Sequence, residues 1–114
     1  KGLRTIVHNC SAEPFWESQM KVGPTALHLN LRSVNMDEII CKLRGRTAFI
    51  AGIEHTDLLL NGTPKEIETK VEETISAWDK APGLIIGPGC ELPYKTPLEN
   101  ILALRNGTIY HGTY

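Results

Sequence analysis

Cysteine is scarce in this sequence, with three residues among 114: Cys10, Cys41 and Cys90. A small, odd number excludes a disulfide framework and favours a reducing, cytoplasmic setting. Long apolar runs are also missing, because no segment approaches the roughly 18–20 residues that span a bilayer, and no signal-peptide pattern occurs. We therefore expect a domain with neither disulfides nor a membrane segment.

An excess of charge is absent as well. The formal net charge is −1, with 12 basic and 13 acidic residues interspersed along the chain. This balance gives no electrostatic basis for binding nucleic acid or an anionic membrane surface. With 41% hydrophobic residues, a chain of this length can bury a core of its own, and we expect one domain over residues 1–114.

Four strand-like segments alternate with helix-like segments along the chain. Thr-Pro-x-Glu sequences begin two of the helices, because a threonine cap and a glutamate three residues later form a capping box. Strands that alternate with amphipathic helices predict parallel β/α units. The expected strands are 5–8, 26–31, 47–53 and 84–86, and the expected helices are 14–22, 36–43, 64 to the Pro82-Gly83 stop, and 96–104.

Two metal-binding side chains follow the first expected strand. In T-I-V-H-N-C, residues 5–10, His8 and Cys10 lie two positions apart and so leave an extended chain on the same side. Parallel α/β sheets carry their chemistry at the carboxyl ends of the strands, where both residues fall. Two interpretations are open: a buried histidine with an inert thiol that together close the strand, or two ligands of a metal site.

Cys90 supplies a third candidate ligand at the end of the fourth expected strand. It follows Gly87-Pro88-Gly89, and we expect these glycines to adopt unusual dihedral angles and to approach a bound group closely. One imidazole and two thiolates suit Zn²⁺, and three protein ligands leave the fourth tetrahedral position open for a substrate. If the side chains meet, they predict a catalytic zinc site.

The remaining cysteine and histidines have simpler interpretations. Cys41 lies in the apolar run I-I-C-K-L, and we assign it to core packing. His28 and His55 are expected on a strand face or in a loop rather than as ligands. His111 belongs to a polar carboxyl-terminal segment that we expect to be frayed.

Three stretches resemble the carboxyl-terminal half of the uroporphyrinogen decarboxylase superfamily. They follow one another in the family's order and extend from about residue 3 to residue 105. The stretches are T-I-V-H-N-C-S-A-E-P-F-W, A-G-I-E-H-T-D-L-L-L-N-G-T-P-K-E-I and G-P-G-C-E-L-P-Y-K-T-P-L-E-N-I-L-A-L. That superfamily folds as a (β/α)₈ barrel, so the resemblance implies an α/β domain with parallel β/α units, the last half of a TIM barrel.

Half a barrel exposes two strand edges and one wall of its core. A complete barrel has about 250 residues, so the resemblance implies that the amino-terminal half lies outside these 114 residues. We expect the chain to pair with a second copy, as a homo-oligomer, or with the missing amino-terminal half.

Within the superfamily, the resemblance favours the zinc methyltransferases, such as methylcobamide:coenzyme M methyltransferase. These enzymes carry a His-x-Cys pair and a later cysteine, a pattern that His8, Cys10 and Cys90 match. The implied reaction moves a methyl group between a corrinoid on a partner protein, as methylcobalamin, and a small thiol such as coenzyme M. The neighbouring candidates for a supporting role or a reversible fourth ligand are Asn9, Glu13 and Glu91.

The implied mechanism depends on thiolate formation. A free thiol with a pKa of about 8.5 is mostly protonated at neutral pH, whereas binding to zinc deprotonates it. Two other functions stay open. One is uroporphyrinogen decarboxylase activity in porphyrin biosynthesis, although the arginines that could hold porphyrin carboxylates are scattered. The other is a half-barrel fragment without catalytic activity.

Overall fold

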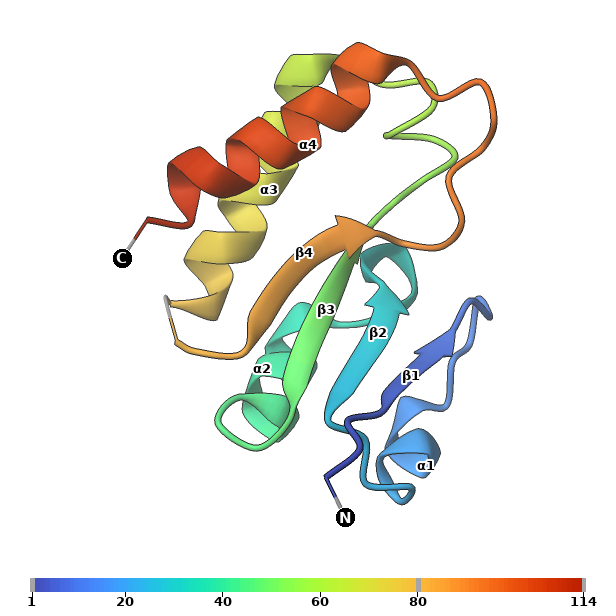
Figure 1. Ribbon diagram of the computed structural model, residues 1–114, viewed down its shortest axis with the longest axis vertical. Helices are drawn as coiled ribbons and strands as arrows, with labels where there is room; N and C mark the ends of the chain where they lie inside the picture. The colour runs from blue at the N-terminus through green and yellow to red at the C-terminus, as the bar shows by residue number, and fades with distance from the viewer. Residues whose placement is uncertain (1, 80, 114) are drawn as a thin grey trace.

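The computed structural model, which describes residues 2–79 and 81–113, contains a four-stranded sheet in the order β1-β2-β3-β4. All three pairs of neighbouring strands are parallel (Figure 1), as the alternation of elements predicts. No helix within these ranges is long and apolar enough to cross a bilayer. The strands are β1 Ile6–Asn9, β2 Ala26–Asn30, β3 Ala48–Ile53 and β4 Leu84–Pro88, and the helices are α1 Trp16–Met20, the 3₁₀ helix η1 Leu31–Ser33, α2 Met36–Leu43, α3 Pro64–Trp78 and α4 Leu98–His111.

Helix α3 begins as its sequence predicts. The Thr63 hydroxyl accepts from the Glu66 backbone N–H, and the Glu66 carboxylate accepts from the Thr63 backbone N–H, which completes the capping box. The same expectation for α4 is wrong. The Thr96 hydroxyl donates instead to the Pro93 carbonyl at 2.8 Å, and α4 begins after Pro97 without a side-chain cap.

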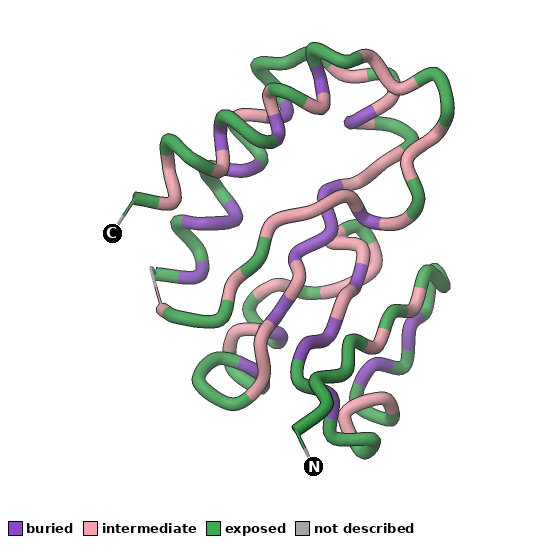
Figure 2. Tube along the Cα trace, viewed as in Figure 1, coloured by how far each residue is buried: buried purple, intermediate pink, exposed green. Residues whose placement is uncertain are grey.

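Two apolar clusters form the core, and both lie on the helix side of the sheet. The first joins β2 and β3 to α2, with Leu27, Leu29 and Phe49 fully buried. The second joins the end of β3 to α3 and α4 through Ile67 and Val71. Figure 2 shows the buried segments in the middle of the sheet and along the inner sides of these helices.

In the described part of the chain, no helix lies over the opposite face of the sheet (Figure 1). Because His8, His28, Ile50 and Ile85 are in register across the four strands, their side chains share this face. Ile85 is 49% exposed, and Ile6 on the same face is 65% exposed. The almost unbroken apolar run of residues 47–53 predicts a strand that is buried on both faces, but this prediction is wrong, since Ile50 on the uncovered face is only half-buried.

The structure corrects the expectations for the first helix and for Cys41. The first helix is shorter than 14–22, because Phe15 adopts a left-handed conformation with φ 42° immediately before it. Cys41 is exposed rather than packed in the core, since Ile39 and Leu43 form the buried side of α2.

His111 is the last residue of α4 and does not lie in a frayed tail. Gly107 is buried where α4 packs against α3, and a Cβ there would make an ordinary contact of 3.6 Å with the Glu68 Cα. The Thr108 hydroxyl also donates to the Leu104 carbonyl at 2.7 Å. Packing against α3 thus continues a helix that the polar sequence N-G-T predicts to end.

Candidate metal centre

The three predicted ligands come together at the carboxyl ends of the strands. His8 lies on β1, Cys10 follows β1, and Cys90 follows β4. Their ligand atoms, one nitrogen and two sulfurs, all lie within 4.8 Å of one another. His8 and Cys10 are neighbours in the sequence, whereas Cys90 lies far along the chain, so the fold brings Cys90 to the other two.

The spacing of the three atoms suits a small tetrahedral cation. Zinc bonds of about 2.0 Å to nitrogen and 2.3 Å to sulfur place tetrahedral ligands about 3.3–3.8 Å apart. The separations of up to 4.8 Å therefore need to contract by about 1 Å. Rotation about the cysteine χ1 bonds suffices for such a change, so the donor set fits zinc in both chemistry and size.

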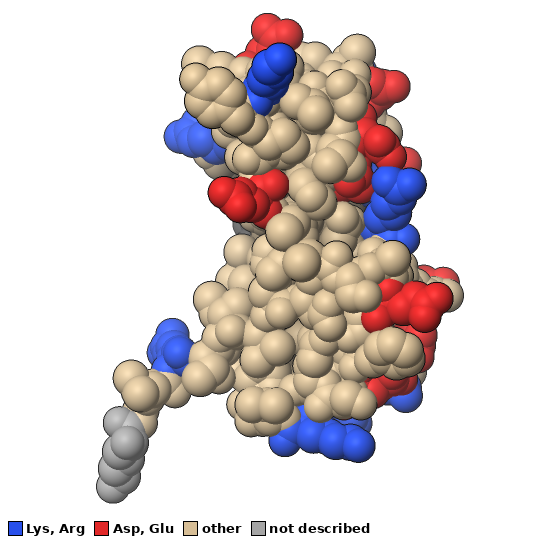
Figure 3. Space-filling model, turned by 90° about the vertical axis from the view of Figure 1, so that its right-hand side faces the viewer, with Lys and Arg blue, Asp and Glu red and all other residues tan. Residues whose placement is uncertain are grey.

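The site is open to solvent. His8 and Cys10 are exposed, and Cys90 is half-buried. Figure 3 shows the side of the molecule that lies to the right in Figure 1, where β1 runs, and its centre is largely uncharged with acidic and basic side chains toward the margin. Such access suits a centre at which a substrate completes the coordination, rather than a closed structural site.

Asn9 shapes the turn that carries Cys10. Its side-chain oxygen accepts from the Ser11 backbone N–H at 2.8 Å, and its side-chain nitrogen donates to the Pro14 carbonyl at 2.9 Å. The oxygen and the nitrogen of the Asn9 side-chain amide both hold this turn. These contacts support the candidate role of Asn9 as a residue that orients Cys10 without binding the metal itself.

The two candidate glutamates have less support. Glu13 contributes a backbone N–H that donates to the Ser11 hydroxyl at 3.2 Å. Among the residues that the structure describes, neither the Glu13 nor the Glu91 side chain forms a hydrogen bond or an ion pair, and both residues are exposed. A fourth-ligand role for either stays a prediction.

The loop before Cys90 crosses the end of β3 at very short range. The Gly89 N–H donates to the Ile53 carbonyl at 2.6 Å. A Cβ on Gly52 would lie 2.5 Å from the Leu29 carbonyl oxygen and 2.6 Å from the Gly89 Cα. Gly87 and Gly89 do not have positive φ angles, so close approach, rather than an unusual dihedral angle, explains the glycine at position 89.

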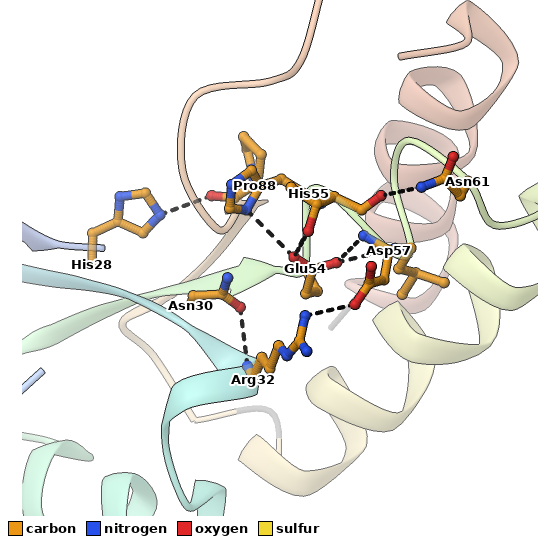
Figure 4. A network of polar contacts seen from close by, with 10 residues as sticks. His28, Asn30, Arg32, Glu54, His55, Asp57, Asn61 and Pro88 are labelled. Atoms are coloured by element: carbon orange, nitrogen blue, oxygen red, sulfur yellow. Dashed lines mark hydrogen bonds and ion pairs between the residues drawn. The ribbon is translucent and has the colours of Figure 1, made fainter. Parts of the chain in front are cut away.

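His28 lies between the two parts of the site, a position that sequence patterns do not reveal. Its Nε2 lies 2.8 Å from the Pro88 carbonyl oxygen (Figure 4). Burial lowers the pKa of His28, the hydrogen bond to Pro88 opposes that shift, and the neighbouring His8 lowers the pKa further. His28 is therefore held as a neutral imidazole whose Nε2–H donates to the loop.

The loop after β3 is organised by a single carboxylate. Glu54 accepts from the backbone N–H groups of Thr56, Asp57 and Leu58 and from the Thr56 hydroxyl. Burial would raise its pKa, but these hydrogen bonds outweigh burial and lower the pKa to about 2. Arg32 extends the network to Asp57 across 2.6 Å (Figure 4).

A parallel sheet of β/α units with its candidate site at the carboxyl ends of the strands is typical of the β/α-barrel class. The sequence profile described as uroporphyrinogen decarboxylase (URO-D) matches residues 1–107. The chain belongs to the uroporphyrinogen decarboxylase family. A search of curated proteins finds no significant match.

Among solved structures, the chain is similar to a methyltransferase from Methanosarcina mazei. The TM-score is 0.81 at 20% sequence identity, over 96% of this chain. The likeness confirms the predicted fold, part of a TIM barrel. The chain spans 32% of the length of that methyltransferase, about a third.

Proposed function

We propose that this chain is the zinc-binding part of a methyltransferase that moves a methyl group between a corrinoid protein and a small thiol such as coenzyme M. The observation that carries the proposal is the meeting of His8, Cys10 and Cys90 within 4.8 Å at an exposed site. The fold of the M. mazei methyltransferase supports the same reaction class.

His8, Cys10 and Cys90 would hold the zinc. When bound, zinc lowers the pKa of a substrate thiol so that it is a thiolate at neutral pH. The two cysteine thiolates add negative charge, which keeps a bound sulfur electron-rich and favours nucleophilic attack. The zinc would thus supply a thiolate nucleophile, and the corrinoid of the partner protein would supply the methyl group and keep the electron pair of its cobalt–carbon bond.

Metal analysis tests the proposal directly. Protein purified with zinc and passed through a desalting column should retain about one zinc per chain, and Cys90→Ser should lose it. Cys41→Ser is the matched control, because Cys41 is an exposed cysteine on α2, and it should retain the metal. A folded wild-type chain that binds no zinc would exclude this function.

Uroporphyrinogen decarboxylase activity is the alternative that the family description suggests. It needs basic groups to hold the substrate carboxylates, and the ion pairs weigh against it. Arg32 pairs with Asp57 at 2.6 Å and Arg44 with Asp79 at 3.1 Å, so both guanidinium groups already have carboxylate partners. Formation of coproporphyrinogen from uroporphyrinogen by the purified chain would establish this activity instead.

We also propose that the uncovered sheet face binds the rest of a barrel, either an amino-terminal half or a second copy of this chain. Ile6 and Ile85 expose apolar surface there, and such surface favours association. Sedimentation should show a dimer or larger species for the isolated chain. A stable monomer that binds zinc but transfers no methyl group would identify it as a half-barrel without activity of its own.

A further inference from the structure

The metal ligands lie on opposite edges of the sheet, which raises a problem of distance. Neighbouring strands are about 4.8 Å apart, so β1 and β4 lie roughly 14 Å apart in a flat sheet. The Cys90 sulfur nevertheless lies within 4.8 Å of the donor atoms of His8 and Cys10. Some contact must therefore hold the loop that carries Cys90 across the ends of β2 and β3, the two strands between β1 and β4.

His28 on β2 makes that contact on the side of the loop. A carbonyl oxygen only accepts hydrogen bonds, so the 2.8 Å contact to Pro88 requires a hydrogen on the His28 Nε2. Pro88 precedes Cys90 by two residues, and Figure 4 shows the His28 ring directed at it from β2. The hydrogen bond connects residues that are 60 positions apart in the chain.

The same residue contacts His8 on the other side. The His8 Nδ1 lies 3.2 Å from the His28 carbonyl oxygen, and must therefore carry a hydrogen, which leaves the His8 Nε2 free to bind a metal. The two rings also pack together, with centroids 4.4 Å apart and an interplanar angle of 31°. Their register across β1 and β2 places them side by side.

We propose that His28 is a positioning residue of the metal centre: it orients His8 through its backbone carbonyl and holds the Cys90 loop through its ring. This inference rests on the proposed zinc site. His28 is not itself a ligand, because its ring nitrogen is committed to Pro88 and it lies outside the group of converging donors. Residues that orient ligands in this way affect metal affinity by about 10–100-fold.

The test compares two substitutions of His28, to glutamine and to asparagine, whose amide side chains differ in length by one methylene. In His28→Gln the side-chain nitrogen reaches about as far as Nε2 and still donates to Pro88, whereas in His28→Asn it is too short. We expect zinc affinity, measured by competition with a chromophoric chelator, to fall about 10–100-fold in His28→Asn and to recover in His28→Gln. His111→Leu, which removes a histidine at the end of α4, should leave it unchanged.

Cobalt provides a readout of geometry that is independent of turnover. Co²⁺-loaded His28→Asn should show altered d–d and thiolate charge-transfer bands, and His28→Gln should resemble the wild type. Equal affinities and spectra for the two variants would overturn the inference while leaving the zinc site intact. A wild-type chain that binds neither Zn²⁺ nor Co²⁺ would exclude the site itself, and circular dichroism confirms that each variant is folded.

Discussion

The amino-terminal β1–α1 unit and the α3–α4 pair differ sharply in how they are stabilised. Every residue of β1 is at least partly exposed, and α1 has five residues and no side-chain cap. Helix α3, by contrast, has 15 residues, a complete capping box and five buried side chains. Two of the three candidate ligands nevertheless belong to the weakly packed unit.

This difference indicates where the metal centre obtains its geometry. His8 lies on β1 and Cys10 directly follows it. Within the described chain β1 pairs with β2 alone, so the positions of both ligands depend on the turn at Asn9 and on contacts to His28. Cys90 lies on a loop that is held against β3 and β2. A bound zinc would connect these two segments, and disruption of either should weaken the site.

The largest effect is expected where the Cys90 loop crosses β3. Gly52→Ala would place a Cβ against two backbone atoms, at 2.5 and 2.6 Å, and should destabilise the fold by about 3 kcal/mol in urea unfolding. Gly87→Ala is the matched control, because Gly87 pairs in register with Gly52 and its Cβ would meet its nearest neighbour at 3.6 Å. Similar losses in both variants would contradict the crossing.

Glu54→Gln should cause the next largest loss of stability. It removes the charge of the carboxylate that accepts hydrogen bonds from the backbone of the loop after β3. The folded pKa of about 2 lies below the ordinary value of 4.5, so the carboxylate contributes stability above pH 4.5 and loses it as the pH falls through 2. We expect a loss of about 2–3 kcal/mol at pH 7. The measurement is the free energy of unfolding at several pH values between 2 and 5. If it changes with pH by the same amount in the wild type and in Glu54→Gln, the assignment is wrong.

Zinc binding should stabilise the weakly packed β1–α1 unit and so bring its stability closer to that of the α3–α4 pair. At a zinc concentration 100 times the dissociation constant, binding stabilises the native state by about 2.7 kcal/mol, so hydrogen exchange of the β1 amides should slow by up to roughly 100-fold. The effect should disappear in Cys90→Ser. If β1 exchanges at the same rate with and without zinc, the metal does not connect it to the Cys90 loop.

The smallest effect is expected for Cys41→Ser. Cys41 is exposed on α2, and surface substitutions of this kind change stability by about 0.5 kcal/mol or less. The midpoint of urea unfolding and the zinc content should both match those of the wild type. A larger loss would mean that Cys41 packs against a partner.

Local patterns account for most of the elements and fail where packing overrides them. Residues 36–43 are helical as expected, and the Asn35 side chain caps this helix by accepting from the backbone N–H groups of Asp37 and Glu38. Thr63 begins α3 as its capping box requires. The sequence of α4 predicts an end at Leu104, yet the helix continues to His111 because Gly107 packs against α3. A helix end depends on tertiary contacts as well as on local propensity.

By itself, the sequence determined the alternation of strands and helices, the family, and the placement of His8 and Cys10 on one side of a strand end, because each depends on residues close together in the chain. Only the tertiary structure decided that Cys90 reaches those two residues, and that His28, Gly52 and Gly89 bring it there. The physical reason is that these contacts depend on strand order and on the path of a loop across neighbouring strands, which local periodicity does not encode.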